Sequence, residues 1–377
     1  SGNEEEVHAL MSNRFRLNLK AKINKNLQFH GRLTMYKNWM DNDYSDFLDY
    51  RASRRPSDND LNVERAYVDY FFKLHDKLPM ALSFGRLPMA DGLPTDFREN
   101  TPRKATFPSL AYDTEGDGIG LSIILDKLTG LNNSAFRFIY MRVNDDNERS
   151  LYRTSELDLE EANYYIAQFE TMLPGKYLKD ILFIVNFIAL PDIPSMDLTG
   201  QGLRPIDLPE SMGDMWYLTT FMQAKRFLGT NFDWFCGFSY FDLDTHGGPV
   251  QYGLGPIPIN VTFNNNDNYS EKSATAYHVG FRYNIPIDFL NVPKFGVEYN
   301  HGSKYWMGNT GASEDPLNKL STRGYAWDFY YIQPINRNLT LRLGHTLVRN
   351  RYKMGMSGPD HVKQKIKNTY LLLDAKF

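Results

Sequence analysis

Hydrophobic and polar residues alternate along most of this chain. From Phe15 to Ile23 every odd position is apolar and every even position is polar or basic, and the alternation resumes from Leu27 to Met35 after the short turn 24–26. A period of two places neighbouring side chains on opposite faces of a β-strand. These residues therefore predict a β-hairpin with one apolar face and one polar face.

The same pattern recurs often enough to predict about fifteen strands, near the length of roughly 9–11 residues that crosses a bilayer at a tilt. The predicted strands cover residues 9–23, 27–36, 66–74, 82–86, 119–125, 134–144, 163–171, 181–190, 216–226, 232–243, 275–284, 295–306, 325–333, 339–349 and 365–377. The outward face of the sixth strand stays open, because its even positions 136–140 and its odd positions 139–143 are both apolar.

The connections between these strands alternate between short and long. The short ones lie near 24–26, 75–79, 127–133, 172–180, 228–231, 285–293 and 335–338, and the long ones near 41–60, 87–116, 145–160, 191–213, 244–272, 307–322 and 350–364. Outer-membrane barrels have short periplasmic turns and long outer loops. We therefore predict that residues 1–377 form one all-β domain, a transmembrane antiparallel up-and-down β-barrel; a large soluble antiparallel sandwich is the alternative.

The direction of the strands predicts one more of them. The first and last predicted strands both run toward the short-turn end, whereas an antiparallel barrel closed on itself has an even number of strands. We expect a barrel of about 16 strands in the complete protein, with the extra strand either before Ser1 or missed internally. Residues 1–8 would then be the remnant of the first outer loop.

Composition excludes several other classes of protein. The hydrophobic content of 42% and the mean hydropathy of −0.48 exclude a helical membrane protein. The longest apolar run, Ile181–Leu190, is too short for a membrane helix of about 20 residues. The aromatic content of 14% suits girdles at two membrane interfaces. A net charge of −3 argues against a nucleic-acid partner and against strong ion selectivity.

The sequence shows no motif that indicates enzyme chemistry. It has no serine elbow, no HExxH and no phosphate-binding glycine loop, so we expect neither an enzyme nor a bound cofactor. The single cysteine, Cys236, rules out an internal disulfide and covalent attachment of c-type haem within this chain. Such scarcity of cysteine suits a protein that crosses the oxidising periplasm.

Three stretches carry a resemblance to a known family. They are the closing strand 365–377, which ends on Phe377, the hairpin 13–36, and the segment GRLPMADG at 85–92. In these the chain resembles the porin superfamily of Gram-negative outer membranes and, within it, a poorly characterised porin-like group from anaerobic bacteria. The resemblance implies a cell outer membrane location, contact with outer-membrane lipid and lipopolysaccharide, and a third outer loop, 87–116, that folds inward as a constriction. It also makes a homotrimer plausible, and Ile181–Leu190 is the candidate interface.

The charged residues of that loop and of the wall facing it are the candidate site. The predicted pore-lining residues are Arg14, Arg16, Lys20, Arg32, Arg86, Asp91, Asp96, Arg98, Glu99, Arg103 and Arg137. Basic side chains on the wall and acids on the loop would set a transverse field across an aqueous constriction. The alternative is that these charges only solvate the wall or pair with one another.

A weaker pattern suggests a metal ion. Asp113, Glu115 and Asp117 have the opening spacing of a calcium loop, but Ile124 stands where the closing glutamate belongs. An acidic loop without an ion is the more ordinary reading, so we expect no metal.

The leading functional hypothesis is an outer-membrane porin that allows passive diffusion of small hydrophilic solutes or ions through a water-filled lumen. The alternative is a barrel that serves as a sleeve around a partner multihaem cytochrome and supports electron transfer across the outer membrane. A barrel with hydrolase activity is a third possibility, for which no recognisable triad is present.

Overall fold

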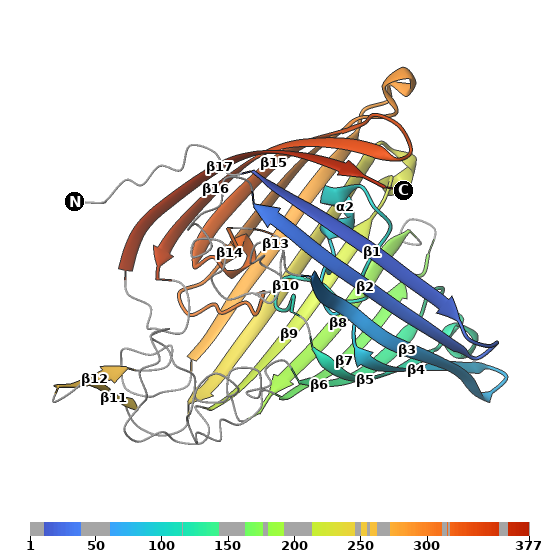
Figure 1. Ribbon diagram of the computed structural model, residues 1–377, viewed down its shortest axis with the longest axis horizontal. Coiled ribbons are helices and arrows are strands. Elements are labelled where there is room, and N and C mark those ends of the chain that lie inside the picture. The colour runs from blue at the N-terminus through green and yellow to red at the C-terminus, as the bar shows by residue number, and fades with distance from the viewer. Residues whose placement is uncertain are drawn as a thin grey trace.

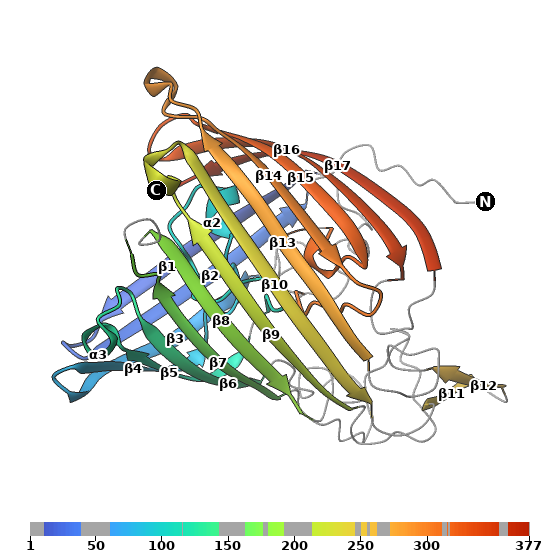
Figure 2. The same cartoon turned by 180° about the vertical axis from the view of Figure 1, so that it is seen from behind.

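One large antiparallel sheet makes up most of the molecule. The computed structural model describes residues 11–38, 61–114, 116–142, 163–175, 180–191, 213–245, 250–254, 257–261, 272–310, 315, 317–353 and 361–376. The sheet has 15 strands, and each pairs with its neighbour in chain order, apart from a separate two-stranded hairpin. Figures 1 and 2 show the sheet curling round, with the helix α2 seen inside the curve.

The strands of the large sheet are β1 (Ser12–Lys22), β2 (Leu27–Asn38), β3 (Leu61–His75), β4 (Leu78–Arg86), β5 (Asp117–Ile124), β6 (Ala135–Arg142), β7 (Asn163–Met172), β8 (Ile181–Leu190), β9 (Gly213–Ala224), β10 (Phe232–Thr245), β13 (Lys272–Asn284), β14 (Lys294–Gly302), β15 (Gly324–Pro334), β16 (Leu339–Tyr352) and β17 (His361–Ala375). The separate hairpin is β11 (Val250–Leu254) with β12 (Ile257–Val261), and the α-helices within the described ranges are α2 (Thr95–Glu99) and α3 (Asp126–Thr129). None of the helices in the described ranges is long and apolar enough to cross a membrane.

The predicted fold class is confirmed, with differences at the ends of elements. The third strand begins at Leu61 rather than Ala66, and a β-bulge between Arg32 and Leu33 separates the two parts of its ladder with β2. The hairpin β11–β12 lies inside a predicted loop, where glycine and proline conceal the alternation. β1 and β17 are the edge strands of the sheet, and the expected sixteenth strand stays a prediction.

The two faces of the sheet have opposite chemistry. Large apolar side chains are exposed on the outer face, as in Phe15 at 53% and Leu371 at 69% exposed. Charged side chains are buried on the inner face, as in Glu298 at 1% and Asp328 at 3% exposed. This inversion of the soluble pattern is what a lipid exterior and a polar interior require. The fold is that of an outer-membrane β-barrel.

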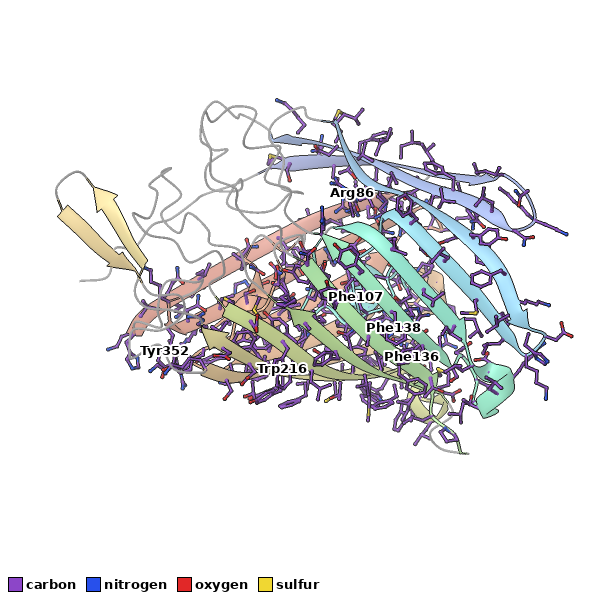
Figure 3. All side chains as sticks on the ribbon, turned by 90° about the horizontal axis from the view of Figure 1, so that it is seen from below. Arg86, Phe107, Phe136, Phe138, Trp216 and Tyr352 are labelled. Atoms are coloured by element: carbon purple, nitrogen blue, oxygen red, sulfur yellow. The ribbon has the colours of Figure 1, made fainter. Side chains whose placement is uncertain are left out.

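An aromatic row crosses the outer face near the long-loop ends of β6 to β10. Ring centroids lie 5.4 Å apart in Tyr140–Tyr165, 5.9 Å in Phe187–Trp216 and 5.3 Å in Trp216–Tyr240. Figure 3 labels Trp216 within this row. Adjacent aromatic rings at one height form the kind of girdle that lies at a membrane interface.

The inner face explains two features of the sequence. In β6, Phe138 is exposed whereas Met141 is fully buried. The even positions of this strand therefore face outward, which decides between the two faces that the sequence left open. In β8, Ile184, Ile188 and Leu190 are buried in apolar clusters with residues of the 87–116 loop. The inward half of the apolar run Ile181–Leu190 therefore packs inside the barrel, its outward half includes the exposed Phe187, and its role as a subunit interface stays a prediction.

Candidate constriction of the lumen

The connection between β4 and β5, residues 87–116, lies inside the barrel as predicted for the third outer loop. Leu87, Phe97 and Tyr112 in this loop are almost fully buried. Its central part is closed at the base by a hydrogen bond from the Leu93 N–H to the Phe107 carbonyl, at 2.9 Å. The loop carries too many apolar side chains to be stable in water, and packing against the inner wall removes them from it.

Asp91 fixes the beginning of the loop to β1, β2 and β3. Its Oδ2 lies 3.8 Å from Arg16 Nη1, 3.4 Å from Arg32 Nη1 and 3.6 Å from Arg65 Nη2. Glu64 on β3 shares two of these partners, at 2.9 Å from Arg16 Nε and 2.9 Å from Arg32 Nη1. The structure thus brings together three of the predicted residues in a network of ion pairs.

The helix α2 crosses to the opposite wall. The Gln223 amide on β9 donates to Asp96 Oδ2 at 3.0 Å, and Lys225 Nζ lies 2.8 Å from the same oxygen. Arg282 on β13 donates from Nη1 to the Phe97 carbonyl at 2.6 Å, and its guanidinium lies 4.7 Å from the centroid of the Phe97 ring. These contacts hold the tip of the loop against β9 and β13.

Arg98 completes a buried charge cluster with β13, β14 and β15. Its Nη1 lies 3.6 Å from Glu298 Oε2 and 3.9 Å from Asp328 Oδ2. Lys319 Nζ pairs with the same two carboxylates, at 3.2 Å from Glu298 Oε2. His278 Nε2 lies 3.3 Å from Glu298 Oε2. Two cations from inward loops therefore share two acids on the wall.

The pKa values of these cations follow from that arrangement. Burial alone would lower the pKa of Arg98, but Glu298 and Asp328 outweigh burial and hold the pKa above its ordinary value. Burial and the charge of Arg98 would lower the pKa of Lys319, but Asp328 and Glu298 again raise it. Both cations stay charged, so the loops are fixed by ion pairs rather than by neutral hydrogen bonds.

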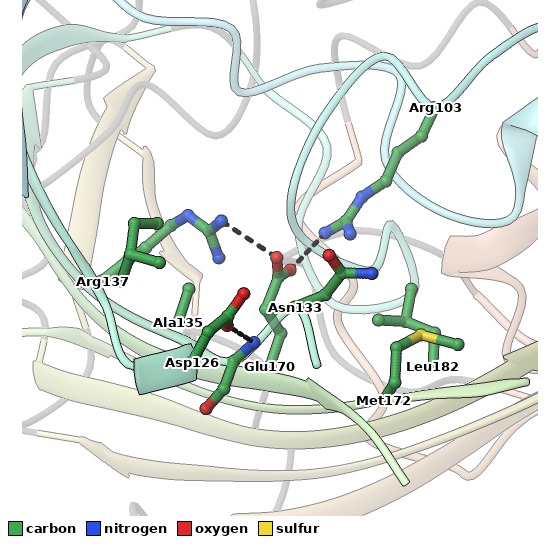
Figure 4. A pocket seen from close by; sticks show the side chains of 10 residues that line it. Arg103, Asp126, Asn133, Ala135, Arg137, Glu170, Met172 and Leu182 are labelled. Atoms are coloured by element: carbon green, nitrogen blue, oxygen red, sulfur yellow. Dashed lines mark hydrogen bonds and ion pairs between the residues drawn. The ribbon is translucent and has the colours of Figure 1, made fainter. Parts of the chain in front are cut away.

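The end of the loop is fixed to β6 and β7 beside a cavity. Arg103 Nη2 lies 2.6 Å from Glu170 Oε2, and Arg137 Nη2 lies 2.9 Å from Glu170 Oε1 (Figure 4). The cavity has a volume of about 400 Å³. It is lined by Arg103, Ile124, Asp126, Asn133, Ser134, Ala135, Arg137, Glu170, Met172 and Leu182. Near the tip, the remaining predicted acid, Glu99, pairs with Lys104.

A second inward segment, not predicted from the sequence, joins the first. It belongs to the connection between β14 and β15 and is described over 303–310 and 317–323. Asn309 accepts a hydrogen bond from the Asp113 N–H at 2.8 Å and donates to the Ala111 carbonyl at 2.9 Å. Trp306 in this segment is fully buried. The two segments are thus joined by a short parallel β-bridge inside the barrel.

Three predicted residues take no part in the contacts described so far, and one of them, Arg86, lies on the other face of the sheet. Arg86 follows the exposed Phe84 by two positions and faces outward, where its Nε donates to Asp117 Oδ1 at 3.1 Å. The prediction that Arg86 lines the lumen is wrong, because β4 keeps its alternation to its last residue. Arg14 and Lys20 lie on the inner face of β1, and both are exposed.

The calcium candidate does not come together as a site among the residues that can be placed. Asp113 is buried and accepts a hydrogen bond from the Asp91 N–H at 3.1 Å, whereas the Asp117 side chain is 61% exposed on the outer face. Glu115 lies outside the described residues, as does Phe377. Within the described residues no group of three or more possible metal ligands is gathered.

Sequence reasoning missed the acids that receive the loops. Glu64, Glu170, Glu298 and Asp328 all lie on the inner face of strands. A signal was present, because Glu298 lies between Val297 and Tyr299 and Asp328 lies between two outward aromatic residues. A single acid in an otherwise apolar strand marks an inward position with a partner, since an unpaired buried carboxylate is costly.

The sequence of the chain matches one family over most of its length. The family described as "Protein of unknown function (DUF3373)" matches residues 4–359. The chain belongs to the DUF3373 family. A search of curated proteins finds no match to it.

Solved structures place the fold of this DUF3373 chain among outer-membrane porins. Pseudomonas putida OprB has a TM-score of 0.52 and 14% identity, over 98% of this chain and 88% of that chain. An anion-selective porin from Comamonas acidovorans has a TM-score of 0.52 and 9% identity, over 97% of this chain and 89% of that chain. The outer membrane channel DcaP of Acinetobacter baumannii has a TM-score of 0.52 and 12% identity, over 97% of this chain and 84% of that chain. At such identities the likeness shows the fold alone.

Proposed function

We propose that this chain forms a water-filled channel in the outer membrane, through which small hydrophilic solutes or ions diffuse passively. The observation that carries the proposal is the position of the 87–116 loop, which crosses a polar interior and is fixed to walls on several sides. A loop anchored in this way narrows a lumen without a moving part. The proposal assigns no catalytic step to the chain.

The anchoring pairs are strong enough to keep the loop in place. Asp91, Asp96, Glu298 and Asp328 are each at most 5% exposed, so their ion pairs are shielded from water and salt. Removing one partner of a buried pair typically costs about 3–5 kcal/mol. The constriction should therefore persist at the ionic strength of the cell exterior.

Swelling of liposomes tests the proposal directly. Purified protein is reconstituted into multilamellar vesicles, which are then diluted into isotonic solutions of uncharged sugars of increasing size. We expect rapid swelling with a pentose and progressively slower swelling with a disaccharide and a trisaccharide. Vesicles with heat-denatured protein are the control. A folded barrel that gives no swelling with the smallest solute would contradict a passive channel.

A sleeve around a partner cytochrome is the alternative function. A sleeve around a cytochrome would need both inward segments to leave the lumen, and each is held there by buried contacts. Co-purification of the native protein with a haem absorption band would favour the sleeve. A porin-like trimer stays a prediction, and so does the relation to a group from anaerobic bacteria.

A further inference from the structure

The inner wall carries a row of basic residues along β1. Arg14, Arg16, Lys20 and Lys22 alternate with the exposed apolar residues of the outer face, so all four lie on the lumen side. Residues two apart in a strand lie about 6.7 Å apart along it. The row therefore extends from the long-loop end of the strand to its short-turn end.

A fifth cation closes the gap in this row. Asn18 occupies the inward position between Arg16 and Lys20, and it pairs in register with Arg32 on β2. The Arg32 Nε donates to Asn18 Oδ1 at 2.7 Å, so the guanidinium lies against the one uncharged position. We call the set Arg14, Arg16, Arg32, Lys20 and Lys22 the basic ladder.

The acids nearest the ladder are already engaged by other groups. Glu64 and Asp91 are buried, and Arg65 and Lys104 approach Asp91 in addition to the ladder residues. Farther along the wall, Asp69 lies 3.2 Å from His30 Nε2 and accepts a hydrogen bond from Ser83 at 2.6 Å. With Glu99, which pairs with Lys104, and the buried Asp113 beside Asp91, five carboxylates face seven Lys and Arg side chains in this part of the described chain.

The short-turn end of the ladder, at Lys20 and Lys22, differs from its long-loop end. Lys20 and Lys22 are exposed and form no ion pair with any residue in the described ranges. On the opposite wall the charges balance, because Arg98 and Lys319 face Glu298 and Asp328, and Arg282 faces Asp233 at 2.6 Å. Of those six side chains, all but Arg98 are almost fully buried, so they add little accessible charge to the described lumen, whereas the exposed basic residues of β1 add positive charge.

We propose that the channel selects small anions, such as chloride, inorganic phosphate or short carboxylates, and passes them along the basic ladder. This inference rests on the proposed channel function. Neighbouring cations of the ladder lie within one Debye length, about 8 Å at physiological salt, so their fields overlap. A net charge of −3 for the whole chain does not oppose this, because an ion in the lumen responds to the charges nearest to it.

The reversal potential under a KCl gradient in planar bilayers tests the proposal. The wild-type protein is compared with the double variant Lys20→Glu/Lys22→Glu. The control is Lys367→Glu, which makes the same kind of charge change on the outer face of β17, in line with the exposed Leu371. A unit charge about 6 Å away changes the local concentration of an ion about threefold in a water-like dielectric. We expect a chloride-to-potassium permeability ratio above one, and at least a tenfold fall in the double variant only.

The outcomes separate the ladder from the channel itself. Two results would contradict anion selection by the ladder while leaving the proposed channel intact. One is ohmic steps from the wild-type protein with a chloride-to-potassium permeability ratio at or below one. The other is a change of that ratio in the Lys367→Glu control as large as the change in the double variant. The absence of any steps from a folded wild-type barrel would overturn the channel. If the double variant does not fold, as judged by heat-modifiable gel mobility, Lys20→Gln/Lys22→Gln takes its place, with a fall of about threefold or more expected. An unchanged ratio in that variant would also overturn the ladder.

Discussion

At the scale of single residues, the charges of the lumen divide into two kinds. Glu298, Asp328 and Lys319 are nearly inaccessible to water and hold two loops to the wall. Lys20 and Lys22 are exposed and form no ion pair with any of the described residues. The first kind should determine stability, because buried charges depend on their partners, and the second kind should determine ion selectivity.

The substitution Glu298→Gln tests the structural kind. It leaves Lys319 and Arg98 with one acid between them in a buried site, so we expect the free energy of unfolding to fall by about 3 kcal/mol. The measurement is urea unfolding in lipid vesicles, followed by tryptophan fluorescence. Asp117→Asn is the matched control, since its exposed pair with Arg86 should contribute less than about 1 kcal/mol. An equal loss of unfolding free energy in Glu298→Gln and Asp117→Asn would contradict the distinction between buried charges that stabilise the fold and exposed ones that do not.

Alternation in the sequence predicted which residues face inward, but not which of them meet. Arg16, Arg32 and Asp91 were expected in the site, and the structure places both arginines within 3.8 Å of the Asp91 carboxylate. The partner of Arg98 could not be found in this way, because Glu298 lies 200 positions along the chain and only the curvature of the sheet brings the two together. Arg86 was expected on the wrong face, because it follows the exposed Phe84 by two positions in β4 and therefore points to the same side of the sheet.

At the scale of elements, glycine and tyrosine alternate across the last four strands. Gly296 on β14 pairs with Tyr330 on β15, Tyr330 pairs with Gly344 on β16, and Gly344 pairs with Tyr370 on β17. A Cβ added at Gly296 would overlap the Tyr330 ring, and one at Gly344 would overlap the Tyr370 ring. Each tyrosine therefore lies flat over a glycine, close to the buried charge cluster.

The substitution Gly296→Ala should displace the Tyr330 ring. We expect it to lower the free energy of unfolding by about 2 kcal/mol, as overpacking of a close contact typically does. Gly120→Ala is the control, because its Cβ would meet Ile139 Cγ1 at an ordinary 3.6 Å. The same vesicle unfolding assay serves both variants. A Gly296→Ala protein as stable as the control would contradict the close packing of this row.

Elements were the most predictable level of this structure. Each of the fifteen strands of the sheet was expected near its observed position, because a period of two is strong where lipid lies on one side and water on the other. The second inward segment was not expected. The predicted strand 295–306 ended too late, because β14 ends at Gly302, and the residues after Trp306 are rich in glycine and polar side chains, which is the composition of a solvated loop.

At the scale of the whole molecule, an apolar exterior encloses a charged interior that two segments cross. The residues between Leu93 and Phe107 include α2 and reach the far wall, while their two ends are hydrogen-bonded to each other at 2.9 Å. This geometry allows residues 95–105 to be replaced by Gly-Ser-Gly without moving the base of the loop. The replacement removes the crossing part and leaves the barrel wall unchanged.

The single-channel conductance of the wild-type and loop-shortened proteins in planar bilayers is the most direct test of the constriction. We predict stable, ohmic steps from both proteins, with a conductance clearly larger in the shortened one, because the segment that narrows the lumen has been removed. Folding of both proteins is checked by heat-modifiable mobility. Equal conductance from the two folded barrels, or no conductance from either, would contradict a channel narrowed by the 87–116 loop.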